Sequence, residues 1–280
     1  MKPVSCDVNG YRMHYVDSGA GSPVVLIHGS LCDYRYWPLQ GKVFSRYHRV
    51  LTPSLRHYYP ERWDGRGNGF TLEQHAADIA AFIRELDLGP VHLVGHSRGG
   101  YLAFQLACEH PELLRSTVLA EPGGDLDGSM QAPDEDEPSQ LDPTMISGAL
   151  KKLREGDVDG GLALFLDTVS GPGTWDRSPE KFRDAARDNA YTLIGQVNDR
   201  PRRYTREQAQ SIRLPVLLVG GSRSPAPFPQ IIRALGSHIP GARTLFIDNA
   251  THTMNLEQPD DFNNAVLDYF QDVETGAQHP

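Results

Sequence analysis

The segment Gly95-His96-Ser97-Arg98-Gly99-Gly100 constrains the fold of this chain more than any other. It follows an apolar run at residues 91–94 and precedes a helical pattern that begins near Gly99. A serine with glycine two residues before and two residues after it, between a strand and a helix, is typical of the sharp turn called a nucleophile elbow. Such a turn leaves no room for side chains at the flanking positions, which explains both glycines. It lifts the Ser97 hydroxyl out at the C-terminal edge of a sheet, within reach of a base.

Length, composition and charge narrow the class of protein. The 280 residues suffice for one large α/β domain with an insertion, or for two domains. Hydrophobic residues make up 39% of the chain, which indicates a globular protein. The net charge of −9 argues against nucleic acid or an anionic membrane as a partner, because no basic stripe is present to neutralise phosphates.

The cysteines and the N-terminal residues predict a cytoplasmic protein. Cys6, Cys32 and Cys108 lie far apart without metal-ligand spacing, so we expect reduced, mostly buried thiols and no metal site. Residues 1–5 lack the apolar core of a signal peptide, and no apolar run reaches the length of a membrane span.

Strands and helices alternate along the first half of the chain. Strands are expected at residues 11–16, 24–27, 49–52, 91–94 and 117–120. The fully apolar run at 24–27 is typical of a strand covered on both faces, as in a parallel sheet. Helices are expected over residues 71–86 and from Gly99 to about His110. In the first of them, Thr71 and Gln74 form a capping box and Gly89 acts as the C-cap.

A predicted helical insertion interrupts this alternation after Glu121. Residues 123–143 are rich in Gly, Pro, Asp and Glu, and we expect a loop in which the acidic run 134–137 is solvated. Three helical patterns follow: one after Asp142 as N-cap, one over residues 158–169, and one from Ser178-Pro179 to about Leu193. Strands at 214–219 and 244–247 and a helix at 259–270 complete the pattern. We therefore expect a core of residues 1–122 and 206–280 and a helical cap of residues 123–205.

A general base for Ser97 is expected at His252. This histidine lies in a loop directly after the last predicted strand and before the last predicted helix. Loops at the C-terminal ends of parallel strands are where such sheets keep their reacting groups. A serine nucleophile requires such a base, an acid that orients the base, and hydrogen-bond donors for the oxyanion.

The oxyanion donors are expected to be backbone N–H groups. One belongs to Arg98, the residue after the nucleophile, and the other to Ser30, in the loop His28-Gly29-Ser30-Leu31 after the strand at 24–27. An ordinary strand-to-loop turn is the alternative explanation for the second motif.

Taken together, these motifs resemble those of the α/β-hydrolase superfamily over nearly the whole chain. The resemblance implies an α/β fold with a doubly wound, mostly parallel sheet of about eight strands and an inserted helical cap. The similar branch contains esterases, lactonases, carbon–carbon bond hydrolases, epoxide hydrolases and haloalkane dehalogenases. The last two use an aspartate nucleophile, so Ser97 argues against both.

The resemblance implies an enzyme that cleaves a carboxylic ester or lactone through a serine acyl-enzyme. No cofactor is expected, the partner is a small-molecule substrate, and the protein is a monomer or a homodimer. The alternatives are a carbon–carbon bond hydrolase, a hydroxynitrile lyase, a cofactor-free oxygenase, or a receptor-like binding protein on the same scaffold.

The acid departs from the commonest pattern in this superfamily. Many relatives carry the acid as Gly-x-x-Asp after the strand at 214–219, where this chain has Ser224. Some members keep the acid at the end of the preceding sheet strand, where this chain has Glu121. We therefore predict a Ser97–His252–Glu121 triad, with Asp125 or Asp248 as the alternative acid.

The substrate pocket is the least constrained part of the prediction. Tyr34, Trp37, Arg56, Trp175 and Met254 are the candidate substrate-binding residues. Ordinary packing is the alternative explanation for the aromatic residues. Arg56 and Arg98 favour a carboxylate-bearing substrate unless they form salt bridges within the fold.

Overall fold

The computed structural model describes residues 2–130, 143–199 and 202–276. Within these residues the strands form one eight-stranded sheet in the order β1-β2-β4-β3-β5-β6-β7-β8. β2 runs antiparallel to β1 and β4, and the remaining pairs from β4 to β8 are parallel. The strands are β1 (Val4–Val8), β2 (Tyr11–Ser18), β3 (Pro23–Ile27), β4 (Arg49–Pro53), β5 (Val91–His96), β6 (Leu114–Ala120), β7 (Val216–Gly221) and β8 (Arg243–Ile247). The α/β fold with a mostly parallel sheet is therefore confirmed.

Helices cover both faces of the sheet because its central strands are apolar on both sides. In β3, Val25 and Ile27 face one core cluster and Val24 and Leu26 face the other, as the two-residue period of a strand requires. The first face packs against α2 (Leu72–Glu85), α3 (Arg98–Glu109), α9 (Arg206–Ser211) and α10 (Phe228–His238). The second packs against α1 (Pro38–Phe44), α11 (Met254–Glu257) and α12 (Pro259–Thr275). Short 3₁₀ turns are η1 (Tyr34–Tyr36), η2 (Pro111–Leu113) and η3 (Gly128–Met130).

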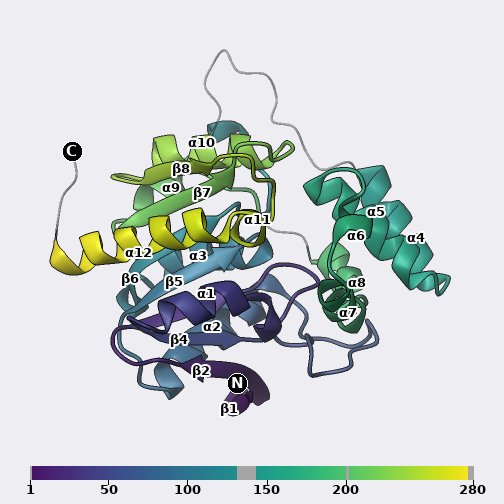
Figure 1. Cartoon of the computed structure of the whole chain (residues 1–280), viewed down its shortest axis with the longest axis horizontal. Coiled ribbons are helices and arrows are strands. Elements are labelled where there is room, and N and C mark those ends of the chain that lie inside the picture. Colours follow the sequence, from purple (N-terminus) through teal and green to yellow (C-terminus); the bar gives the residue numbers. More distant parts are fainter. Residues whose placement is uncertain (1, 131–142, 200–201, 277–280) are drawn as a thin grey trace.

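A separate group of helices lies between β6 and β7 in the sequence and beside the sheet in space (Figure 1). This α4–α8 block consists of α4 (Pro143–Arg154), α5 (Val158–Ser170), α6 (Thr174–Arg177), α7 (Glu180–Asp188) and α8 (Thr192–Asn198). It has its own apolar core, to which Leu31 and Phe228 of the sheet region contribute. Leu126, Met130 and Tyr204, which flank the block in sequence, pack instead into a core cluster of the sheet. The cap boundaries at residues 123 and 205 remain predictions.

Three local predictions from sequence differ from the structure. Thr71 caps α2 by accepting a hydrogen bond from the Gln74 N–H (3.0 Å), but the Gln74 side chain binds Asp78 (2.8 Å), so the capping box is half formed. α2 ends at Glu85, and Asp87 rather than Gly89 takes the first left-handed conformation (φ 46°) after it. The single helix expected from residue 178 is two helices, α7 and α8, because the chain turns at Asn189. The expected N-cap Asp142 and the acidic run at 134–137 lie outside the described residues.

The described helices include none with the combined length and apolar character needed to cross a bilayer.

Candidate active site

Ser97 lies at the turn between β5 and α3, and its backbone is in a sparsely allowed conformation. Its φ of 53° is unusual for a residue with a side chain and is typical of functional turns. A Cβ on Gly95 would lie 2.1 Å from the Gly99 carbonyl oxygen, and one on Gly99 would lie 2.4 Å from the Ile27 carbonyl oxygen. The prediction that this turn has no room for side chains beside Ser97 is therefore confirmed, and the close approach of neighbouring backbone is the reason.

Glu121 and His252 are brought together at the same edge of the sheet. Glu121 follows the last residue of β6, and its N–H donates to the Val219 carbonyl oxygen (2.9 Å). The His252 Nδ1–H donates to Glu121 Oε2 across 2.7 Å, and both side chains are buried. Because a carboxylate only accepts hydrogen bonds, this contact places the proton on Nδ1 and leaves Nε2 as the basic nitrogen.

The surroundings hold both members of this pair in place. The second carboxylate oxygen of Glu121 accepts the Gly221 N–H at the end of β7 (2.8 Å). The His252 ring stacks on Phe228 with 3.9 Å between ring centroids. The His252 carbonyl oxygen accepts a hydrogen bond from His96 Nε2 (2.8 Å). His96 is buried, which lowers its pKa to about 3, so it donates as a neutral ring.

The loop that carries His252 is further fixed by Glu257. The carboxylate of Glu257 accepts the Thr251 N–H (2.9 Å) and the Thr253 hydroxyl (2.6 Å). Burial raises the pKa of Glu257, but these hydrogen bonds outweigh it and leave the pKa below its usual range. The residues on either side of His252 are thus bound to one ionised side chain.

The other carboxylates considered from sequence lie elsewhere. Asp248 is exposed at the end of β8, and the Asp125 backbone pairs with Tyr204. The Ser224 hydroxyl is buried without a hydrogen-bond partner among the described residues. Glu121 is thus the carboxylate that binds the His252 ring.

The loop after β3 lies directly against the Ser97 turn. A Cβ on Gly29 would lie 3.0 Å from His96 Nδ1 and 3.1 Å from the Ser97 Cβ, closer than most Cβ contacts, so the glycine allows this close approach. His28 supports the loop: its Nε2 accepts the Leu55 N–H (3.1 Å) and its Nδ1–H donates to the Gly29 carbonyl oxygen (2.8 Å). Burial lowers the pKa of His28 to about 4, so the ring is neutral and its role is structural.

Arg98 is the first residue of α3, so its N–H lacks an intrahelical acceptor. Its side chain is buried rather than open to a substrate. The guanidinium donates to His75 Nδ1 (3.3 Å), lies 3.6 Å from the Asp199 carboxylate, and covers the Phe70 ring. Burial lowers the pKa of Arg98, and the Asp199 charge partly offsets this effect.

The predicted pocket residues are dispersed through the structure. Trp37 and Met254 are buried in a core cluster of the sheet, and Trp175 is buried in the core of the α4–α8 block. Arg56 forms an ion pair with Asp78 (2.8 Å). Tyr34 is half-buried, with its N–H bound to the Ser54 hydroxyl (3.1 Å). Their contact with a substrate remains a prediction.

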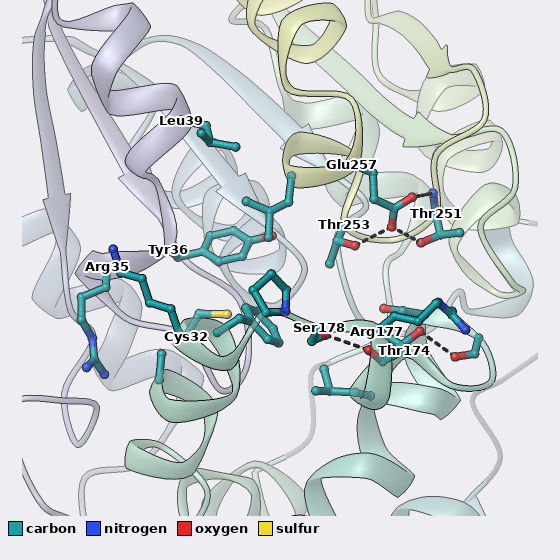
Figure 2. Close-up of a pocket in the computed structure, with 18 of the residues that line it drawn as sticks. Cys32, Arg35, Tyr36, Leu39, Thr174, Arg177, Ser178, Thr251, Thr253 and Glu257 are labelled. Atoms are coloured by element: carbon teal, nitrogen blue, oxygen red, sulfur yellow. Dashed lines mark hydrogen bonds between the residues drawn. The ribbon is translucent and has the colours of Figure 1, made fainter.

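A cleft of about 1100 Å³ lies between the α4–α8 block and the sheet region (Figure 2). The block contributes residues of α5 to α7, including Leu166 and Phe182. The opposite wall contains Tyr36 and also Thr251 and Thr253, the two neighbours of His252. None of the five predicted pocket residues, nor Ser97, lines this cleft as the described residues form it.

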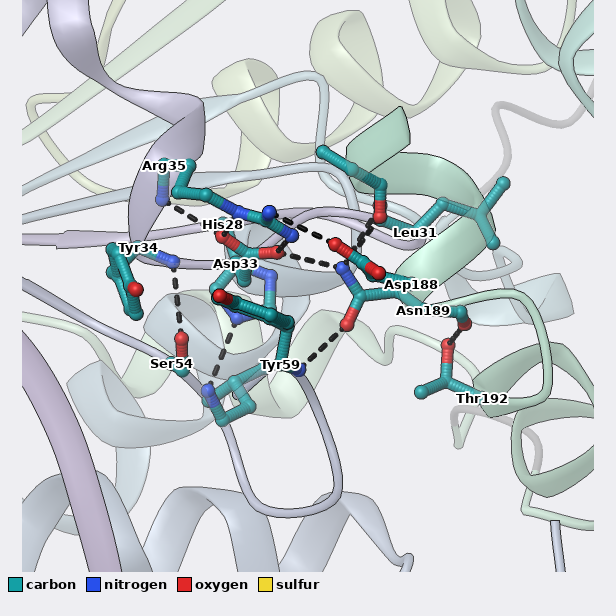
Figure 3. A network of polar contacts seen from close by, with 12 residues as sticks. His28, Leu31, Asp33, Tyr34, Arg35, Ser54, Tyr59, Asp188, Asn189 and Thr192 are labelled. Carbon is teal, nitrogen blue, oxygen red and sulfur yellow. Dashed lines mark hydrogen bonds and ion pairs between the residues drawn. The ribbon is translucent and has the colours of Figure 1, made fainter. Parts of the chain in front are cut away.

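A buried polar network joins the block to the loops beside the cleft (Figure 3). Asn189 donates to Asp33 Oδ2 (2.7 Å) and accepts the Tyr59 N–H (2.7 Å). Arg35 binds Asp33 (2.7 Å) and Asp188 (2.9 Å). Sequence reasoning missed Asn189 because its partners lie far away in the chain and no local pattern marks it.

Comparisons with known proteins agree with this fold. A model of the alpha/beta hydrolase family matches residues 24–265. The Mycobacterium tuberculosis protein with the provisional name non-heme bromoperoxidase BpoC is 30% identical over 287 residues, covering 94% of this chain and 98% of that protein. The enol-lactonase of Burkholderia xenovorans LB400 superimposes with a TM-score of 0.76 and 20% identity, over 96% of this chain and 100% of that one. The esterase EaEST of Exiguobacterium antarcticum does so with a TM-score of 0.78 and 20% identity, over 94% and 97% of the two chains.

The extent of the family match and the near-complete coverage of the BpoC relative lead to one conclusion: this chain belongs to the alpha/beta hydrolase family.

Proposed function

We propose that the protein hydrolyses a carboxylic ester or lactone of a small to medium organic substrate through an acyl-enzyme on Ser97. The observation that carries the proposal is the buried hydrogen bond of 2.7 Å between His252 Nδ1 and Glu121 Oε2. A base oriented by a buried carboxylate, at the sheet edge where a strained serine turn lies, is the arrangement that serine acyl transfer requires.

The reaction proceeds in two halves. In the first, Ser97 Oγ attacks the substrate carbonyl carbon while His252 Nε2 accepts the serine proton. Glu121 stabilises the imidazolium that forms, because its carboxylate stays ionised and bonded to Nδ1. His252 then gives the proton to the leaving alkoxide oxygen, and an alcohol (or the ring-opened hydroxyl of a lactone) is released from the acyl carbon.

In the second half, water replaces the alcohol. His252 accepts a proton from water as it attacks the acyl carbon, and returns that proton to Ser97 Oγ as the carboxylic acid forms. In both halves the developing oxyanion accepts hydrogen bonds from the N–H groups of Ser30 and Arg98, each worth about 3 kcal/mol.

Two of the structural neighbours support an ester or lactone as the substrate class. The names of the two structural neighbours describe an enol-lactonase and an esterase. The cleft beside the His252 loop supports a substrate of small to medium size, since its volume of about 1100 Å³ is that of a small-molecule site and its wall includes Thr251 and Thr253. We propose that the α4–α8 block acts as the cap of this site.

The test is covalent labelling and turnover of the full-length protein. A fluorophosphonate probe should label the wild type on Ser97, and Ser97→Ala should lose both labelling and hydrolysis of p-nitrophenyl esters and lactones. Product analysis must show an acid and an alcohol. Turnover that survives in Ser97→Ala, or products of carbon–carbon cleavage, would contradict the proposal.

A further inference from the structure

The two residues assigned to the oxyanion hole are both bound, through their own side chains, to one turn of the α4–α8 block. The Ser30 hydroxyl donates to Gln196 Oε1 in α8 (2.8 Å). Arg98 Nη2 lies 3.6 Å from Asp199 Oδ2, and Asp199 is the C-cap of the same helix. Gln196 and Asp199 are three residues apart and are therefore neighbours at the end of α8.

Gln196 also binds Tyr58, a residue that packs against His28 at the start of the Ser30 loop. Gln196 Nε2 donates to the hydroxyl of Tyr58 (3.2 Å), a fully buried residue. The Tyr58 ring packs edge-on against His28 with 4.7 Å between ring centroids. His28 in turn holds the Gly29 carbonyl oxygen (2.8 Å). The Gln196 side chain thus contacts both Ser30 and Tyr58, whose ring packs against His28.

Asp199 also binds the first residue of α2. Asp199 Oδ2 accepts the Leu72 N–H (2.5 Å) at the first turn of that helix. The Arg98 guanidinium is held between this carboxylate, His75 Nδ1 and the Phe70 ring, with its side chain 5% exposed. A charge buried this deeply is expensive to leave without a counter-ion, so Arg98 resists separation from Asp199.

We propose that the C-terminal turn of α8, through Gln196 and Asp199, positions the two oxyanion N–H groups, so that seating of the α4–α8 block assembles the oxyanion hole. The inference rests on the proposed function. Gln196 and Asp199 are positioning residues, because they act through Ser30 and Arg98 and do not touch the reacting atoms. Misplacement of a catalytic group by about 1 Å lowers a rate by up to about 10²-fold, so loss of either contact should be visible in kcat.

The experiment uses Gln196→Leu, Ser30→Ala, the double variant and Asp199→Asn in the full-length protein. Gln196→Leu should lower kcat for a p-nitrophenyl ester by about tenfold while KM changes less than about twofold, because donors aimed at the oxyanion act chiefly in the transition state. Affinity for a trifluoromethyl ketone, which forms an oxyanion on Ser97, should fall by the same factor as kcat/KM. The double variant should lose no more than the larger single loss, because the two changes share the loss of the same Ser30–Gln196 hydrogen bond. Asp199→Asn should likewise lower kcat more than it changes KM.

The matched control is Asp159→Asn, which breaks the ion pair of Asp159 with Arg187 (2.8 Å) between α5 and α7 without touching the sheet region. It should keep the wild-type kcat even where it lowers Tm. Three outcomes would overturn the inference: a wild-type kcat in Gln196→Leu, an effect confined to KM, or additive losses in the double variant. The proposed function would stay intact in these cases if the wild type is still labelled on Ser97. A wild type that neither reacts with fluorophosphonate nor hydrolyses esters would overturn both.

Discussion

Glu121 binds the His252 ring although 131 positions separate the two residues in the chain, and the contact of 2.7 Å joins two buried side chains. Glu121 reaches the ring from the end of β6, the strand next to β5 and its Ser97 turn. The position that follows β7, where Ser224 lies, contributes a hydroxyl without a partner among the described residues. The neighbouring strand thus supplies the carboxylate.

Replacement of Glu121 by glutamine should lower kcat by about 10³- to 10⁴-fold, because an amide no longer selects the Nδ1–H tautomer or stabilises the imidazolium. The measurement is steady-state hydrolysis of a p-nitrophenyl ester. Ser224→Ala is the control, and it should change kcat by less than about twofold, since the Ser224 hydroxyl has no hydrogen-bond partner in the part of the chain that the structure describes. The opposite ranking of the two variants would refute the assignment of Glu121.

Gly221→Ala should distort the loop that carries His252. A Cβ at this position would lie 2.4 Å from the Ala250 carbonyl oxygen and 2.5 Å from that of Thr251. The loop must move, and a shift of about 1 Å at His252 is expected to lower kcat by up to about 10²-fold. Gly41→Ala in α1 is the control, because a Cβ there meets no atom within 4 Å. Gly41→Ala should keep its activity and have the same or a higher Tm, because alanine favours helices. Equal activity of Gly221→Ala and Gly41→Ala would rule out the steric explanation.

Asn189→Leu should loosen the attachment of the α4–α8 block. It removes the bonds to Asp33 Oδ2 and from the Tyr59 N–H, each 2.7 Å long. The Tyr59 N–H loses its acceptor, whereas Asp33 Oδ2 keeps its bond to Arg35 (2.7 Å). The expected loss is about 2 kcal/mol in the free energy of unfolding, measured by chemical denaturation. Asp184→Asn is the control: it breaks an exposed pair with Arg187 and should cost less than about 0.5 kcal/mol. A stability of Asn189→Leu equal to that of the control would show that this network does not hold the block.

Stability should fall as the pH drops from 7 to 4. Burial lowers the pKa of His28 and His92 to about 4 and that of His96 to about 3, and it also lowers the pKa of His75 well below its usual value. These rings are neutral in the folded protein and protonate near pH 6.5 when unfolded, so the unfolded state binds more protons below that pH. Stability is fully present above about pH 6.5 and is lost as the pH falls towards the folded pKa values. Urea denaturation at several pH values should show uptake of more than one proton on unfolding near pH 5.5; a stability independent of pH between 7 and 5 would contradict this.

Much of the sheet could be predicted from sequence because the constraints are local. Apolar runs such as residues 24–27 mark strands buried on both faces, and the structure confirms β3 there. The turn at Ser97 is determined by glycines whose Cβ atoms would collide with adjacent backbone. The elements β1, α1 and α9 were not predicted because they are only five to seven residues long and carry a weak periodic signal. The longer helix α10 was missed as well.

In the candidate site, too, some residues could be predicted from the sequence and others could not. Ser97, His252 and Glu121 were chosen by their places at strand ends, because parallel strands bring their C-terminal ends to one edge. Their catalytic roles stay predictions, but the contact between His252 and Glu121 is a property of the structure. The aromatic residues near the motifs carry no such positional signal, and the structure places Trp37 and Met254 in the core of the sheet.

The amino-acid sequence by itself determined where strands and helices alternate along the chain, the turn at Ser97 and the kind of residue that follows each strand. These features depend on steric and hydrophobic constraints that act over a few residues. Only the tertiary structure decided which surfaces of the α4–α8 block meet the sheet region. The bonds of Gln196 to Ser30, of Asp199 to Arg98 and of Asn189 to Asp33 each join residues about a hundred or more positions apart. Such contacts depend on packing of the whole chain, which no local periodicity records.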